Sequence, residues 1–260
     1  MWREPRRNFR EIASGGSVFD CPVTVFVIFV NDMADLIRAL KDLRFRMFYG
    51  ALMSHRYPLV TLGNRATDCA WSFCPSEINS QSIIYSGGVG RDITFEHALV
   101  KQFGSNVLLF DPSPTGLETM SRPENKIPQF KYQAVALAGQ CGILKFSRPL
   151  YEDEGSWFKQ SGNEAGLEVP CVDLATLMRQ NGHDHIDLLK IDIEGAEYEV
   201  IDDFLRRRLP IKQVLVEFHN NLLPGITCKQ TIRALLKMRM AGYRLVKKDG
   251  ENHSFIEQNL

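Results

Sequence analysis

The sequence predicts an α/β fold built on a doubly wound, mainly parallel sheet. Short apolar runs alternate with amphipathic helical segments from residue 82 to residue 256, which is the pattern of repeated strand–helix units. A glycine-rich loop follows the first of these strands, and a turn rich in carboxylates follows a buried strand near residue 190. Ligands of open parallel sheets bind at the carboxyl ends of strands, so both features predict a binding site there.

The composition is that of an ordinary globular protein, with 44% hydrophobic and 24% charged residues among 260. Lys plus Arg and Asp plus Glu each number 31, and this zero net charge argues against a surface built mainly for nucleic acid. Six cysteines without a C-x-x-C pair predict free, mostly buried thiols and a cytoplasmic location. A Cys69–Cys74 disulfide is the alternative for a secreted protein.

Residues 1–65 are predicted to form an N-terminal extension before a main domain at residues 66–260. Four early arginines precede a largely apolar run at residues 18–30, which imitates a signal peptide or membrane anchor. The run is too short to span a membrane and is interrupted by Asp20 and Pro22. We therefore expect no integral membrane span, but a buried strand at residues 23–30 and a helix through Leu43.

The main domain divides into elements at glycine, proline and capping residues. The segment 147–168 is polar and long for a loop, and we expect Trp157 and Phe158 within it to form an apolar wall over the acceptor. A mobile loop with both aromatics in the core is the alternative. The predicted strands are 82–85, 107–110, 132–137, 143–146, 188–191, 212–218 and a closing hairpin of 243–246 with 253–256; the predicted helices are 94–103, a short one around Leu117, 173–180, one after Gly195, and 227–240.

The glycine-rich loop indicates a cofactor that contains a nucleoside. Gly87, Gly88 and Gly90 lie between a strand and a helix, where glycines let the chain turn tightly and let a ligand approach the main chain. Asp111, at the end of the next strand, suits a carboxylate that accepts hydrogen bonds from ribose hydroxyls. A dinucleotide and S-adenosylmethionine both satisfy this pattern. Ile93 stands where a dinucleotide motif has its third glycine, which favours S-adenosylmethionine.

The acidic turn supplies Asp192, Glu194 and Glu197 after the central strand. We expect Asp192 and Glu194 to be functional, whereas Glu197 could simply favour the start of its helix. A solvated acidic turn is the alternative for all three. In the neighbouring strand, the period of two places Glu217 and His219 on one side. His219 is predicted to be a general base held by a carboxylate; a divalent ion bound by these groups is the alternative, and we predict no metal.

Three stretches resemble the FkbM-type S-adenosylmethionine-dependent methyltransferases. They are S-I-I-Y-S-G-G-V-G-R-D-I-T-F-E at residues 82–96, V-L-L-F-D-P-S-P at 107–114 and D-L-L-K-I-D-I-E-G-A-E-Y-E-V-I at 187–201. The resemblance extends from Trp71 to the C-terminus, and the acidic-turn motif is its most specific part. It implies a class I, Rossmann-like methyltransferase fold with a seven-stranded sheet and an antiparallel last strand. It also implies methyl transfer to a hydroxyl of a sugar or another small acceptor.

Carried over by position, the resemblance implies roles for individual residues. Gly87, Gly88 and Gly90 would face the methionine part of S-adenosylmethionine, Asp111 its ribose, and Asp192 the methyl group. Ser86 and the stretch 137–139 lack acids that such enzymes often have, so apolar or main-chain contacts near Ala136 and Leu137 would hold the adenine. A scaffold that binds the cofactor without turnover, and a nicotinamide oxidoreductase, are the alternative functions.

Overall fold

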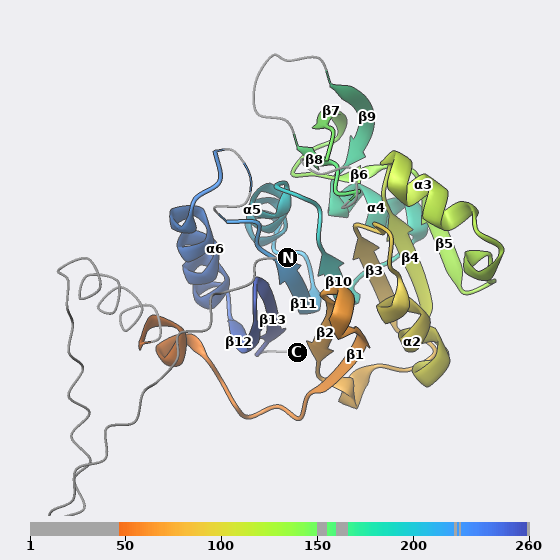
Figure 1. The fold of residues 1–260 in the computed structure, drawn as a ribbon. Helices are drawn as coiled ribbons and strands as arrows, with labels where there is room; N and C mark the ends of the chain where they lie inside the picture. The colour runs from red at the N-terminus through yellow and green to blue at the C-terminus, as the bar shows by residue number, and fades with distance from the viewer. Residues whose placement is uncertain (1–46, 150–154, 160–165, 221–222, 224, 259–260) are drawn as a thin grey trace, which may run out of the picture. The chain divides into compact units, whose positions relative to one another are not determined.

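The computed structural model describes residues 47–258 of the protein, apart from residues 150–154, 160–165, 221–222 and 224 (Figure 1). The strand and helix predicted within residues 23–43 lie outside the described residues. Residues 47–52 are helical, and Tyr49 and Leu52 from this turn of helix pack into the main hydrophobic core. The Tyr49 hydroxyl also lies 2.8 Å from Nε2 of the buried His253.

A seven-stranded sheet in the order β12-β13-β11-β10-β3-β4-β5 forms the centre of the described domain (Figure 1). The last strand, β13, is antiparallel to both of its neighbours, and the other neighbouring strands are parallel. This order confirms the class I methyltransferase fold that the sequence predicted. The strands are β3 (Ile83–Gly87), β4 (Asn106–Phe110), β5 (Phe130–Gln133), β10 (Ile186–Ile191), β11 (Ile211–Glu217), β12 (Tyr243–Asp249) and β13 (Asn252–Glu257).

Each face of the sheet buries its own layer, because successive side chains of a strand point to opposite faces. In β10, Leu189 and Ile191 belong to the core shared with three helices, whereas Leu188 belongs to a second core that contains Trp71 and Phe73. Complete burial of each such side chain contributes about 1.5–3 kcal/mol. The first face is covered by α4 (Leu174–Asn181), α5 (Glu197–Arg207) and α6 (Cys228–Met240), and the second by α2 (Thr94–Phe103) with the hairpin of β1 (Val60–Asn64) and β2 (Cys69–Phe73).

The helix ends follow the capping residues that the sequence contains. The Asp173 side chain accepts the N–H of Thr176 at the start of α4, and Gly182 ends that helix in the left-handed conformation. Gly104 ends α2 in the same way. A capping box of Thr227 and Gln230 begins α6. These boundaries agree with the prediction to within one or two residues.

One prediction about strands was wrong. The strand predicted at 132–137 divides into β5 and β6 (Ala136–Leu137), because the chain makes a tight turn in which the N–H of Val135 donates to the oxygen of Gln133. β6 belongs to a separate four-stranded sheet, β6-β9-β7-β8, that also contains the strand predicted at 143–146. The sequence analysis missed β9 and the β1–β2 hairpin. The remaining members of the smaller sheet are β7 (Gly142–Ser147), β8 (Phe158–Lys159) and β9 (Leu167–Val172).

The five cysteines in the described residues are free thiols. The Cys69–Cys74 disulfide considered above is therefore wrong. Cys74 and Cys171 are buried, but Cys141 and Cys228 are exposed, so the prediction of mostly buried thiols holds for only part of the set. Across the part of the chain that the structure describes, we find no helix with both the length and the apolar character needed to cross a membrane.

Candidate functional site

A cavity of about 380 Å³ opens at the carboxyl ends of the parallel strands, where the strand order reverses between β3 and β10. It is lined by the glycine-rich loop after β3, the residues after β4, the acidic turn after β10 and the end of β11. The sheet brings these segments together because Gly87 of β3 pairs with Ile191 of β10 and with Phe110 of β4. The position and the size are those of a small-molecule site.

The glycine-rich loop contacts the acidic turn directly. Gly88 has a φ of 85°, and a Cβ added to it would lie 1.7 Å from the main-chain oxygen of Asp192. Only glycine fits that approach. The N–H of Gly88 donates to the oxygen of Phe110 at 3.0 Å. Gly90 also has a positive φ, and open space lies beside it, so this part of the loop leaves room for a ligand.

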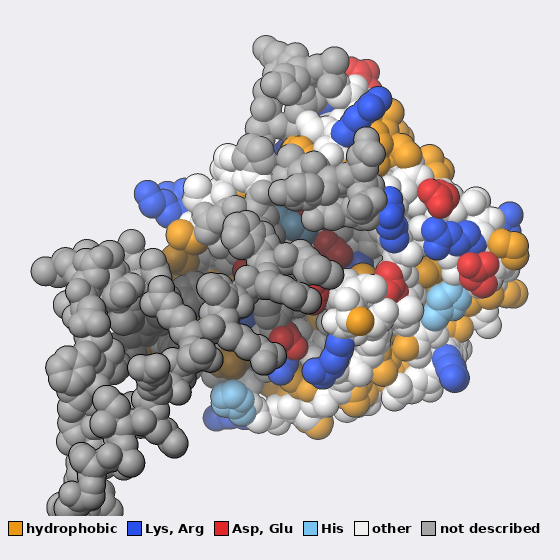
Figure 2. Space-filling view, viewed as in Figure 1, with side chains coloured by type: hydrophobic (Ala, Val, Ile, Leu, Met, Phe, Trp, Pro, Cys, Tyr) orange, Lys and Arg blue, Asp and Glu red, His pale blue; other side chains and the backbone are white. Residues whose placement is uncertain are grey.

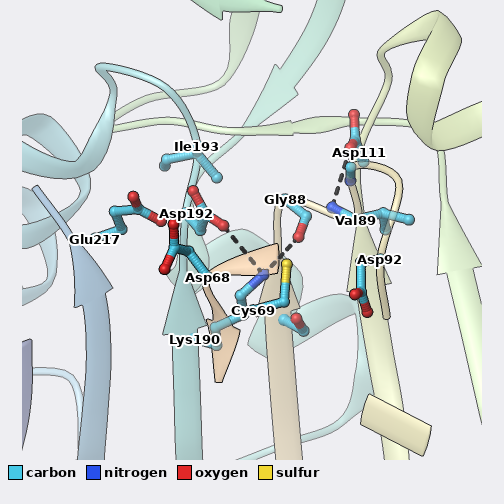
Figure 3. Close-up of polar contacts among 12 residues, drawn as sticks. Asp68, Cys69, Gly88, Val89, Asp92, Asp111, Lys190, Asp192, Ile193 and Glu217 are labelled. Atoms are coloured by element: carbon cyan, nitrogen blue, oxygen red, sulfur yellow. Dashed lines mark hydrogen bonds and ion pairs between the residues drawn. The ribbon is translucent and has the colours of Figure 1, made fainter. Parts of the chain in front are cut away.

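Asp111 holds the glycine-rich loop from the neighbouring strand. Its Oδ2 accepts the N–H groups of Val89 at 3.0 Å and Gly90 at 3.1 Å, and its Oδ1 accepts the N–H of Ser113 at 2.8 Å (Figure 3). Ser113 in turn caps α3 (Pro114–Ser121). The carboxylate thus orders the loop and also lines the cavity. Its Oδ2 accepts two N–H groups, whereas Oδ1 accepts one and keeps a further lone pair.

An apolar wall closes the cavity beside the glycine-rich loop. Ala136 and Leu137 of β6 are buried and line it, together with Phe146. Leu137 packs so closely on β3 that a Cβ on Gly87 would lie 2.5 Å from its Cδ1. The lining of the cavity includes all the residues that the sequence assigned to cofactor binding except Gly87, which packs against Leu137; they are Gly88, Gly90, Asp111, Ala136, Leu137 and Asp192.

Lys190 is a site residue that the sequence analysis did not identify. Its Nζ donates to the oxygen of Gly88 at 2.7 Å and lies 3.6 Å from Asp192 and 3.8 Å from the buried Glu96 (Figure 3). Burial alone would lower the pKa of Lys190, but the charges of Asp192 and Glu96 outweigh it and raise that pKa. A lysine among the apolar residues of a buried strand, L-L-K-I at residues 188–191, is the signal that could have identified it.

The acidic turn is shaped by Glu197, which begins α5 and is completely buried. Its carboxylate accepts the N–H of Ile193 at 3.2 Å and that of Gly195 at 3.0 Å. Glu194 adopts a φ of 51°, which is uncommon for a residue other than glycine. Glu197 is thus a structural centre of the site and does more than favour the start of its helix.

The structure brings the four predicted catalytic residues together around His219, which follows β11 and is buried. Its Nδ1 lies 2.8 Å from Oε1 of Glu197. Its Nε2 lies 3.2 Å from Glu194, 3.7 Å from Asp192 and 3.9 Å from Glu217. We call Asp192, Glu194, Glu217 and His219 the acid–imidazole cluster.

Burial and mutual charge shift the titration of this cluster. Desolvation is the main cause that raises the pKa of Glu194 to about 7 and that of Glu217 to about 8, and the charge on Asp192 adds to both shifts. Burial lowers the pKa of His219, but the charge and hydrogen bond of Glu197 outweigh it, and the pKa lies well above its usual value. Glu194 and Glu217 therefore exchange protons near neutral pH.

Asp192, Glu194 and His219 also have the spacing of metal ligands. Each offers a ligand atom, and these atoms all lie within 4.8 Å of one another. Carboxylates and an imidazole of this spacing suit a divalent cation. The arrangement can therefore act in two ways, as a proton acceptor or as a set of ligands.

Two further segments line the cavity. The sequence analysis expected one of them, within residues 147–168, and did not expect the other, which is the tip of the β1–β2 hairpin. The tip of the β1–β2 hairpin contributes residues 67–69. Residues 155–157 contribute a second wall, fixed by a hydrogen bond from the Thr115 hydroxyl to the oxygen of Gly155 at 2.8 Å. Trp157 lines the cavity, whereas Phe158 is buried in β8. Period-two alternation in V-T-L at residues 60–62 was the available signal for the hairpin.

Comparisons with known proteins identify the family of the chain. The family model of the methyltransferase FkbM domain matches residues 85–245, which include the glycine-rich loop, Asp111, the acidic turn and His219. Among solved structures, the Methanococcus jannaschii fibrillarin pre-rRNA processing protein is similar with 9% identity and a TM-score of 0.39, over 79% of this chain and 84% of that one. No curated protein matches. Because the family model covers more than half of its length, the chain belongs to the FkbM methyltransferase family.

Proposed function

We propose that the protein is an S-adenosylmethionine-dependent O-methyltransferase that acts on a hydroxyl of a sugar or another small acceptor. The observation that carries the proposal is one cavity with two unlike halves. The glycine-rich loop, Asp111 and the apolar wall of Ala136 and Leu137 lie on one side, and the acid–imidazole cluster lies on the other. A nucleoside-containing methyl donor suits the first half, and a group that loses a proton suits the second.

The residues of the first half fit this donor. Asp111 offers lone pairs to ribose hydroxyls, Ala136 and Leu137 offer an apolar surface to a base, and Gly90 leaves open space above the main chain. Asp192, close to Lys190 and at the boundary between the halves, is the residue that we place nearest the transferred methyl group. The donor, when bound, supplies a methyl group activated by a positively charged sulfur.

The protein's own contribution is to align the acceptor and to remove its proton. We assign proton removal to the acid–imidazole cluster, with His219 at its centre. Glu197 fixes the ring of His219 through Nδ1, so that Nε2 points toward Glu194 and the other carboxylates. Groups that titrate near neutral pH are suited to accept a proton from a hydroxyl as its oxygen is methylated. Trp157 at the second wall would exclude water from the transfer.

Calorimetry with S-adenosylmethionine and with NAD tests the cofactor. We expect binding of the first only, and Asp111→Ala should weaken it by about 1–3 kcal/mol through lost charge-assisted hydrogen bonds. Methyl transfer from labelled donor to a panel of hydroxylated compounds tests the reaction. Binding without transfer would indicate a cofactor-binding scaffold, and preference for NAD would indicate an oxidoreductase.

A further inference from the structure

The tip of the β1–β2 hairpin places a carboxylate, Asp68, at the rim of the cavity. This tip lies outside the segment that the family model matches. It is held from two sides. The Thr67 hydroxyl donates to Asp92 of the glycine-rich loop at 2.5 Å, and the Asn252 side chain donates to the main-chain oxygen of Asp68 at 3.4 Å. The rim is therefore a fixed part of the site.

The Asp68 side chain is exposed and makes no hydrogen bond or ion pair with any residue that the structure describes. Figure 3 shows it on the side of Asp192 and Glu217, away from Asp111. A carboxylate in this place faces the half of the cavity that we assign to the acceptor. Its negative charge is available to a bound molecule.

Acidic side chains outnumber basic ones in the lining of the cavity. Of the acidic residues that line the cavity, Asp111 is bound by main-chain N–H groups and Asp92 by Thr67 and the N–H of Thr94. Among the other four acids, Asp192 lies near Lys190, and Glu194 and Glu217 lie near His219, whereas Asp68 has no ion pair with a described residue. Figure 2 shows both acidic and basic side chains on this face. A cationic group of a bound molecule would therefore pair with Asp68, and an anionic group would be repelled by it.

We propose that Asp68 selects an acceptor that carries a protonated amine close to its hydroxyl group, as an amino sugar does. The ammonium group would donate hydrogen bonds to the Asp68 carboxylate while the hydroxyl lies at the acid–imidazole cluster. The proposal rests on the proposed function and specifies its acceptor. It makes Asp68 a specificity-determining residue supplied by the hairpin.

The test compares three sugars that differ in charge. The full-length protein, labelled S-adenosylmethionine and glucosamine, N-acetylglucosamine or glucuronate are combined at pH 7, and kcat/KM is measured for each sugar. We expect the highest value for glucosamine and the lowest for glucuronate. Asp68→Asn should lower the value for glucosamine about fivefold, the size of one partly exposed ion pair, and leave N-acetylglucosamine within about twofold. Asp184→Asn is the control, because Asp184 is 93% exposed and precedes β10 at the opposite end of the sheet.

Calorimetry of the same sugars with protein saturated with S-adenosylhomocysteine gives a second measurement that needs no turnover. The proposal is wrong if glucosamine is neither bound nor methylated better than N-acetylglucosamine, or if Asp68→Asn leaves the preference unchanged. In either case the proposed function stands as long as S-adenosylmethionine binds and its methyl group is transferred to a hydroxylated compound. Failure to bind S-adenosylmethionine would instead overturn the proposed function itself.

Discussion

The Nδ1 atom of His219 lies 2.8 Å from Oε1 of Glu197, and this contact joins the end of β11 to the acidic turn after β10. Glu197 is completely buried and also accepts two main-chain N–H groups of the turn. A carboxylate held in this way fixes the orientation of an imidazole bound to it. The direction of Nε2 thus depends on a residue that does not line the cavity.

Glu197→Gln should disturb this arrangement without changing its size. An amide has one acceptor oxygen, and its NH₂ group would face the N–H donors of Ile193 and Gly195. We expect the free energy of unfolding to fall by about 1–3 kcal/mol and methyl transfer to fall by at least about tenfold, with S-adenosylmethionine affinity within about threefold. Urea unfolding, turnover and calorimetry measure the three quantities. Glu199→Gln is the control, because Glu199 is exposed on the same helix; equal turnover in both variants would contradict the role of Glu197.

The strands and helices of the main sheet were predictable because the strands carry short apolar runs and the helices have explicit start and stop residues. Gly104, Gly182 and the Thr227 capping box appear in the sequence as they act in the structure. The break between β5 and β6 was not predictable, because the residues on both sides of it favour strands. Which sheet β6 joins is decided by pairing with Cys171 and Val172, about 35 residues away.

The candidate site was predictable where one motif carries it and not where distant segments meet. The strands β10 and β11 are adjacent, so their carboxyl ends bring together Asp192, Glu194, Glu217 and His219. The order of these groups along the chain was enough to predict that they meet. The partners of Lys190 and Glu197 could not be predicted, because both side chains turn inward to groups that tertiary structure supplies. Asp68 comes from a hairpin whose packing on α2 has no signature in the sequence.

The stability of the protein should fall as the pH rises from about 5 to about 8. The pKa values of Glu194 and Glu217, about 7 and about 8, lie above the usual 4.5. Between these values the folded protein binds more protons than the unfolded chain, so the free energy of unfolding decreases with increasing pH. His219, whose pKa is also raised, acts in the same direction above pH 6.5. The double variant Glu194→Gln/Glu217→Gln should weaken this dependence of the free energy of unfolding on pH. For a domain of this size, a change of 1 kcal/mol in the free energy of unfolding corresponds to about 2–4 °C in Tm. A wild-type Tm that rises between pH 5 and pH 8 would contradict the pKa shifts of Glu194 and Glu217.

Lys190→Met should destabilise the fold by about 3–5 kcal/mol, because it leaves the buried carboxylate of Glu96 without its cation. Adding Glu96→Gln should restore part of the loss, since the two charges interact across 3.8 Å. Lys212→Met is the control: its pair with Asp187 is partly exposed and should cost less than about 1 kcal/mol. Chemical unfolding measures the free energy of unfolding of the wild type and of four variants, which are Lys190→Met, Glu96→Gln, the double variant and Lys212→Met. Strictly additive losses would show that Lys190 and Glu96 do not interact.

Gly88→Ala should remove cofactor binding, because its Cβ would meet the main-chain oxygen of Asp192 at 1.7 Å. The glycine-rich loop and the acidic turn would have to separate. Gly182→Ala is a matched control, since Gly182 also has a positive φ but open space around it. The control should lose about 1–2 kcal/mol of stability from the left-handed conformation alone and keep its affinity for S-adenosylmethionine. Calorimetry compares the two variants, and equal affinities would show that the close approach is not needed for binding.

The proton acceptor can be separated from a metal site by combining substitutions with a chelator. A base must be deprotonated to act, so the rate of methyl transfer should rise with pH through the range of about 7 to about 8 in which Glu194 and Glu217 titrate. The rate should continue to rise above that range if His219 is the base, because its pKa is raised well above its usual value. His219→Ala and Glu217→Gln should each lower the rate by about 10²–10⁴-fold, the usual contribution of general acid–base catalysis.

EDTA should leave the wild-type rate unchanged if the cluster accepts the proton directly. A rate that EDTA abolishes and added Mg²⁺ or Mn²⁺ restores would instead assign Asp192, Glu194 and His219 as ligands. Full activity of His219→Ala in the presence of EDTA would contradict both roles, because neither a base nor a ligand would then be needed at that position.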